Sequence, residues 1–65
     1  MPIDVDATIP PEYMHAAALD QVVGFIRALH VFPSVKRQLL ARWGYIVGAD
    51  ISPELLQYVQ VVNRK

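Results

Sequence analysis

The chain has 65 residues, of which 54% are apolar, with no cysteine and a formal net charge of zero. A chain of this length buries only about 60% of the surface that it exposes when unfolded, so its own core is small. Disulfides are excluded, and no cluster of His and Cys predicts a structural metal. The remaining sources of stability are tight helix packing and association with other chains, which predict a single domain with a contact surface.

The charged side chains are unevenly distributed along the chain. Residues 1–26 hold four acidic and no basic side chains, a local charge of −4, whereas residues 27–65 hold six basic and two acidic ones, a local charge of +4. The neutral total argues against strong non-specific attraction to nucleic acid or to an anionic membrane. The uneven distribution fits three readings: head-to-tail alignment of copies, a basic face for a partner, or a chance split of solvated charges.

The hydropathy pattern bears on location. No apolar run approaches the ~20 residues that a membrane-spanning helix needs. The N-terminus has no basic segment followed by an apolar stretch, so no signal peptide is expected. Together with the absence of cysteine, these features favour a cytoplasmic location without membrane contact.

The first residues show a different periodicity from the rest. Residues 2–9 alternate between apolar side chains at odd positions and polar ones at most even positions, which is typical of a half-buried strand. Because a lone strand is unstable, the segment predicts an extended arm over residues 1–10 that lies across a helical body, or a strand that pairs with a second copy. We favour the arm.

Residues 11–65 are predicted to form one small three-helix domain, so the fold class is mainly α. The first helix spans about 11–30, because its apolar positions follow helical spacing after two prolines that suit a first turn. The second helix spans 34–47, with Gly48 as its C-terminal stop.

The third predicted helix spans 53–63. Ser52 precedes Pro53, and this pair is a strong start signal because the hydroxyl caps free N–H groups and proline tolerates the first helical position. Residues 57–63 are rich in side chains that favour strands, so an extended conformation there stays open as an alternative.

The side chains argue against catalysis, and the chain is predicted not to be an enzyme. His15 and His30 lie about 20 Å apart on the first predicted helix by its rise per residue, so they do not share a metal within one chain. The hydroxyls of Thr8, Ser34 and Ser52 all sit at helix starts, where capping explains them. No glycine-rich phosphate loop is present, so we predict no catalytic residue, cofactor, metal or small-molecule substrate.

A seam of small residues on the second predicted helix carries the leading functional hypothesis. The seam and its aromatic and basic surroundings comprise Lys36, Arg37, Ala41, Arg42, Trp43, Gly44, Tyr45 and Gly48. Small residues beside aromatic side chains and arginine are typical of a packing interface. The sequence therefore predicts a non-catalytic protein-interaction or oligomerisation module, a small accessory subunit or inhibitor that buries the surface around Trp43 and Tyr45. Its partner is a second copy, as a homodimer, or a larger protein; packing of the seam against the first helix is the alternative.

A DNA-binding regulator is the alternative function. The second and third predicted helices resemble a helix-turn-helix in spacing, and the outward residues of the third would be Gln57, Gln60, Arg64 and Lys65. Glutamine reads adenine edges, and arginine and lysine reach guanine or phosphate. A ribbon-helix-helix layout, with residues 2–9 paired in a dimer, is a variant, although its aspartates would face the phosphates. The neutral net charge weighs against both.

Overall fold

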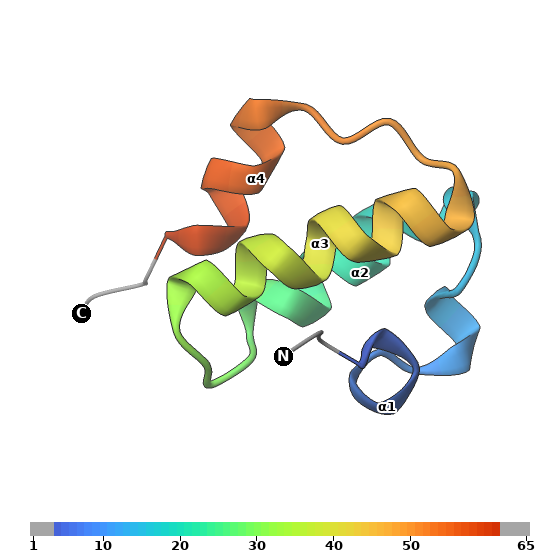
Figure 1. The fold of residues 1–65 in the computed structure, drawn as a ribbon, viewed down its shortest axis with the longest axis horizontal. Helices are drawn as coiled ribbons and strands as arrows, with labels where there is room; N and C mark the ends of the chain where they lie inside the picture. The colour runs from blue at the N-terminus through green and yellow to red at the C-terminus, as the bar shows by residue number, and fades with distance from the viewer. Residues whose placement is uncertain (1–3, 62–65) are drawn as a thin grey trace.

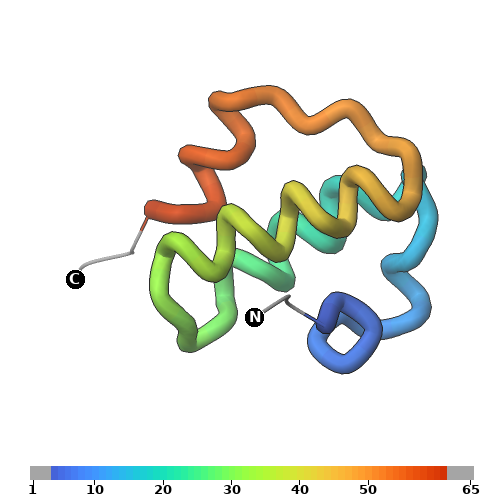
Figure 2. The backbone as a smooth tube through the Cα atoms, in the orientation of Figure 1, coloured from blue at the N-terminus to red at the C-terminus, as the bar shows by residue number. Residues whose placement is uncertain are grey.

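A computed structural model describes residues 4–61, and its helices surround one central helix (Figure 1). Helix α3 spans Pro33–Val47 and contacts α1 (Val5–Thr8), α2 (Leu19–Arg27) and α4 (Pro53–Gln60). The backbone in Figure 2 shows α4 above α3 and α1 below it. The predicted fold class, mainly α with a three-helix body, is confirmed, and residues 4–61 contain no strand.

The first described segment differs from the predicted extended arm, because Val5–Thr8 form one helical turn. The carboxylate of Asp4 caps this turn by accepting a hydrogen bond from the backbone N–H of Ala7 at 3.3 Å. The alternating sequence pattern also places Val5 and Ile9 four positions apart, which brings them onto one side of a helical turn. Both side chains are buried in the core. The paired strand of a ribbon-helix-helix layout is therefore wrong for this segment.

The first long helix begins later than the predicted range of 11–30, because the stretch before α2 forms two 3-10 turns, Pro11–Tyr13 and Ala16–Ala18. The carbonyl of Tyr13 accepts a hydrogen bond from the indole Nε1–H of Trp43 at 2.6 Å. A tertiary hydrogen bond thus takes the acceptor that a continuous helix would use, and it overrides the helical spacing of the sequence.

The same helix also ends before residue 30. Its last residue is Arg27, whose carbonyl accepts a hydrogen bond from the Nζ of Lys36 at 2.6 Å. A cation is favourable at a helix C-terminus, where free carbonyls carry partial negative charge. Lys36 is only 5% exposed, so it is a structural residue of the junction between α2 and α3.

The other two helices begin where the sequence predicts, α3 within one residue of the expected start. Gly48 ends α3 with a left-handed φ of 75°, as expected for a glycine stop. The Oγ of Ser52 accepts a hydrogen bond from the N–H of Leu55 at 3.2 Å, which confirms the predicted cap. Helix α4 ends at Gln60, so residues 57–60 are helical and the strand alternative is wrong for them. The backbone of Val61, the next residue, is extended.

Residues 62 and 63 of the third predicted helix lie outside the described residues.

The core lies between α3 and the helices that cover it. Its buried apolar side chains are Val5, Ile9, Ala18, Val22, Val23, Ile26, Leu39, Leu40, Trp43 and Val59. Trp43 is the largest of those that are fully buried, and it lies in the helix that contacts α1, α2 and α4. The single chain thus encloses its own aromatic centre.

Candidate functional site

The structure divides the predicted seam between the core and the surface. Trp43 is fully buried, so the prediction of an exposed surface around this side chain is wrong. Lys36 and Gly44 are buried as well. The members of the seam that remain exposed are Arg37, Ala41, Arg42, Tyr45 and Gly48. The error has a physical cause, because apolar spacing at i and i+4 marks a buried stripe of a helix as readily as an interface.

Close packing explains the small residue at the middle of the seam. A Cβ added to Gly44 would collide with the Cγ1 of Ile51, which lies in the segment between α3 and α4. The seam is therefore packed within the chain, at Gly44 against this segment. Its neighbours Lys36 and Trp43 donate hydrogen bonds to the carbonyls of Arg27 and Tyr13, which lie within the range of the first predicted helix. Gly48 has the separate role of ending α3.

A different apolar surface is exposed where the α2–α3 loop and the last turn of α4 lie at one end of the molecule (Figure 1). We call it the end face, and it comprises Val31, Phe32, Pro33, Tyr58 and Val61. Phe32 is 78% exposed, and Tyr58 and Val61 are 52% and 54% exposed. Val31 and Phe32 line one hollow, and Pro33, Tyr58 and Val61 line another, so the end face gathers exposed apolar side chains from two hollows at the same end of the molecule.

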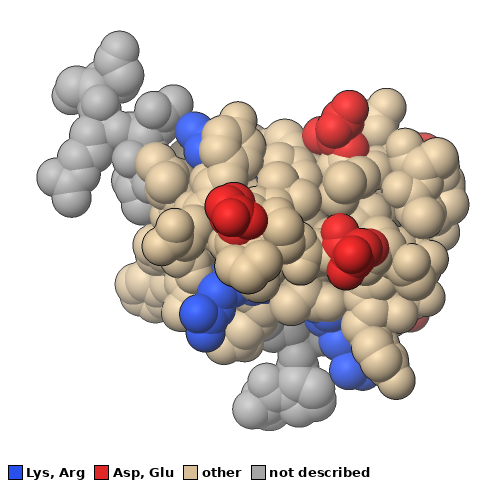
Figure 3. Space-filling view, turned by 90° about the horizontal axis from the view of Figure 1, so that it is seen from above, with Lys and Arg blue, Asp and Glu red and all other residues tan. Residues whose placement is uncertain are grey.

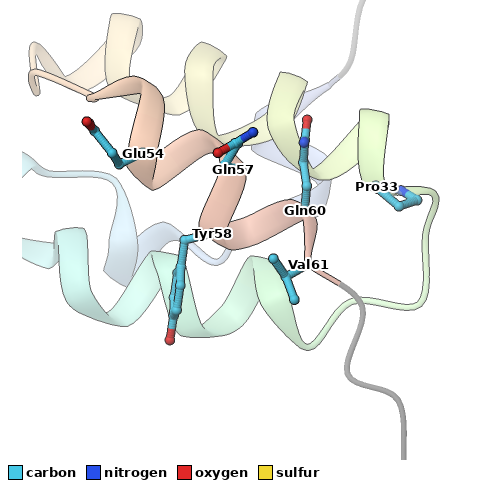
Figure 4. A pocket seen from close by; sticks show the side chains of 6 residues that line it. All are labelled: Pro33, Glu54, Gln57, Tyr58, Gln60 and Val61. Atoms are coloured by element: carbon cyan, nitrogen blue, oxygen red, sulfur yellow. The ribbon is translucent and has the colours of Figure 1, made fainter.

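A hollow of about 570 Å³ lies in the end face, and its lining side chains are shown in Figure 4. Tyr58 in α4 and Val61 directly after it extend towards α2, and Pro33 lies at the start of α3, beyond Val61 as seen from Tyr58. Glu54 lies at the opposite end of the hollow, one α4 turn before Tyr58. Gln57 and Gln60 line the hollow as well, so its wall combines apolar and polar side chains.

Arg27 fixes the position of Tyr58. Its Nη1 donates a hydrogen bond to the carbonyl of Tyr58 at 2.8 Å, and its guanidinium carbon lies 4.3 Å from the centroid of the Tyr58 ring. A cation over an aromatic face is worth about 0.5–1 kcal/mol at an exposed site. The contact joins α2 to the last turn of α4, so half of the end face is held in place by the fold.

The local structure does not require a phenylalanine at position 32. Phe32 is the N-cap residue of α3, and its side chain makes no capping hydrogen bond. Serine, threonine, aspartate and asparagine are strongly preferred at this position, because their oxygen atoms accept a bond from the free N–H groups of the first turn. Sequence reasoning missed this residue, although a signal was present: Phe32 stands directly before Pro33, at a position where a polar capping residue is expected.

The residues of the DNA-binding alternative are only partly described. Gln57 is exposed and Gln60 is half-buried, and both line the hollow of the end face. Arg64 and Lys65 lie outside the described residues. Figure 3 looks onto the face that carries α4, and the basic side chains of residues 4–61 that are visible there lie singly at its edges. DNA binding stays a prediction that this face does not favour.

Other site chemistries find little support among residues 4–61. No group of three or more His, Cys, Asp or Glu side chains within this range is arranged to hold a metal ion. His15 and His30 are both exposed. No helix within the same range combines the length and the apolar character that crossing a membrane requires.

No protein-family model matches the chain, and no match to it is found among the curated proteins or the solved structures. Its function is accordingly inferred from the chemistry of its own residues.

Proposed function

We propose that this chain is a non-catalytic protein-interaction module that binds another protein chain through the end face. The leading hypothesis from the sequence thus keeps its class and moves to a different surface. The seam on α3 is no longer a candidate interface at its centre, because Trp43 lies in the core, whereas the end face exposes Val31, Phe32, Tyr58 and Val61.

The exposed side chain of Phe32 carries the proposal. It is 78% exposed and lies at a position where a polar capping residue would stabilise α3. A residue that breaks a local rule without a gain inside the fold is typical of a functional site. Burial against a partner would remove this ring from water, at about 25 cal/mol for each Å² of apolar surface.

The surroundings of Phe32 have the anatomy of an interface. Phe32 lines a hollow of about 790 Å³ together with Val31 and Val35, and the polar side chains of Arg27 and His30 border it. Arg27 also borders the neighbouring hollow beside Tyr58. Interfaces combine an apolar centre with a polar rim, and tyrosine and arginine are enriched among the residues that dominate binding. The hydrogen bond between Arg27 and the backbone of Tyr58 holds this part of the surface in place before binding, which lowers the cost of ordering it.

Retention of a partner by purified, immobilised chains tests the proposal. Three chains are compared in an extract of the cells that make the protein: the wild type, Phe32→Ser and Tyr45→Ser. The two aromatic side chains are matched in exposure, at 78% and 81%, but only Phe32 belongs to the end face. We expect the wild type and Tyr45→Ser to retain the same protein chain, and Phe32→Ser to lose most of it.

Serine at position 32 is a good capping residue, so loss of the partner is not explained by loss of the fold. Equal retention by Phe32→Ser and the wild type would contradict the proposal. Loss of the partner from Tyr45→Ser alone would contradict it as well, because binding would then depend on the exposed part of the seam.

A further inference from the structure

The molecule measures 32 × 23 × 20 Å, and the carboxylates of its N-terminal part lie apart from Arg27 and Arg37, whereas the exposed Arg42 lies further along α3. Residues 4–20, which we call the acidic region, lie towards one end of the longest dimension, and the end face lies at the other (Figure 1). The acidic region contains four exposed carboxylates: Asp4, Asp6, Glu12 and Asp20. No lysine or arginine occurs in residues 1–26, so no basic side chain of this segment offsets them.

The end face is bordered by two arginines, Arg27 and Arg37, and by one carboxylate, Glu54, which lines the same hollow as Arg37. Arg27 borders a hollow shared with Tyr58 and Val61, and Arg37 borders a neighbouring hollow on the other side of α4. The exposed side of α4 thus lies between two arginines. Glu54 is the one carboxylate that lines the hollow of Figure 4, and it lies at the end remote from Val61.

We propose that the end face docks the acidic region of a second copy of this chain, so that copies associate head to tail. This inference rests on the proposed function and names the partner of the same surface. The exposed carboxylates of one copy complement the two arginines of the next, and the small exposed side chains of Ala7 and Pro11 suit an apolar centre. Apolar burial supplies the affinity, and the charges set the orientation.

Charge also decides between this arrangement and a two-fold dimer. Two end faces packed against each other would bring the arginines of both copies into one interface, where like charges repel. The head-to-tail contact instead joins two different surfaces of the chain. A contact of this kind leaves one free end face and one free acidic region, so copies add in series unless the rotation between them closes a ring.

Two variants of the full chain test the arrangement by blocking one surface each. Phe32→Asn with Val61→Asn places neutral polar side chains in the end face, at two exposed positions of which one is an N-cap that accepts asparagine. Asp6→Lys with Glu12→Lys reverses the charge of two exposed side chains in the acidic region. Circular dichroism establishes that both variants are folded, and sedimentation velocity measures their mass.

We expect the mass of the wild type to rise above 7.3 kDa with increasing protein concentration and to fall again as salt is added. Each variant alone should stay a monomer. An equimolar mixture of the two should form a 1:1 complex that does not grow further, because only one unblocked end face and one unblocked acidic region are present in each pair.

The results that would overturn the inference are different for each step. Self-association of the variant with the reversed acidic region would indicate a two-fold dimer through the end face. A mixture that stays monomeric, or a wild type that is monomeric at millimolar concentration, would exclude head-to-tail association. A monomeric wild type that still retains another protein through Phe32 would leave the proposed function standing, so the two failures are distinguishable.

Discussion

The indole Nε1–H of Trp43 donates a hydrogen bond to the backbone carbonyl of Tyr13, and the two atoms are 2.6 Å apart. This bond joins the central helix α3 to the first of the two 3-10 turns before α2, Pro11–Tyr13. The ring of Tyr13 in turn meets the ring of Phe25 edge to face, with centroids 5.8 Å apart. One side chain of α3 thus fills the core and also positions the first third of the chain.

Replacing this side chain separates its two contributions. Trp43→Phe keeps most of the packing but loses the hydrogen bond, and we expect the free energy of unfolding to fall by about 1–3 kcal/mol. Trp43→Ala should cost about 3–5 kcal/mol, most of the stability of a chain this short. Urea denaturation followed by circular dichroism measures both. An unchanged midpoint for Trp43→Ala would contradict the buried position of the indole.

Two glycines with opposite surroundings form a matched pair. Gly44→Ala places a Cβ against Ile51, so we expect a loss of about 1–3 kcal/mol through overpacking. Gly24 lies in α2, and an added Cβ would meet no atom within 4 Å. Gly24→Ala should therefore stabilise the fold by about 0.4–1 kcal/mol. Thermal unfolding of the two variants under the same conditions measures both changes in stability. Stabilisation by Gly44→Ala would show that the segment around Ile51 packs differently.

Lys36 is expected to stabilise the fold through its hydrogen bond to the carbonyl of Arg27. Lys36→Met keeps the length of the side chain but removes the bond to the carbonyl of Arg27, and we expect the free energy of unfolding to fall by about 1–2 kcal/mol. Arg37→Met is the control at the neighbouring exposed position, where the change should stay within about 0.5 kcal/mol. Equal effects of the two substitutions would mean that Lys36 does not hold the α2–α3 junction.

Replacing Phe32, the N-cap residue of α3, with serine is expected to raise the stability of the fold while it lowers binding. Phe32→Ser adds a capping oxygen at the start of α3, so the free energy of unfolding should rise by about 1 kcal/mol. Tyr45→Ser, at a position with 81% exposure, should change it by less than about 0.5 kcal/mol. A large loss of stability in Phe32→Ser would place the ring among the residues that hold the fold together, and it would remove the reason to assign it to binding.

Much of the helical body was predictable because its signals are local. The Ser52 cap and the Gly48 stop each act within a few positions of the chain, and each predicted a helix boundary close to the observed one. The late start of α2 was not predictable in this way. It depends on the bond between Trp43 and Tyr13, which joins residues 30 positions apart.

The candidate site was harder to predict than the fold, for a related reason. Burial of Trp43 and exposure of Phe32 both depend on which surfaces the other helices cover, and the spacing within one helix does not determine this. The local anomaly at Phe32, an apolar residue at an N-cap, was available in the sequence once the start of α3 was placed. The uneven distribution of charge was visible in the sequence, but only the fold shows that residues 4–20 and the α2–α3 loop lie towards different ends of the molecule (Figure 1).

Photo-crosslinking inside the cells that make the protein tests the central claim, binding through the end face, most directly. A photoreactive phenylalanine analogue replaces Phe32 in one variant and Tyr45 in another, since the two positions are equally exposed in the free chain. We predict a discrete protein adduct from position 32 and none above background from position 45. An adduct from position 45 with none from position 32 would contradict the account.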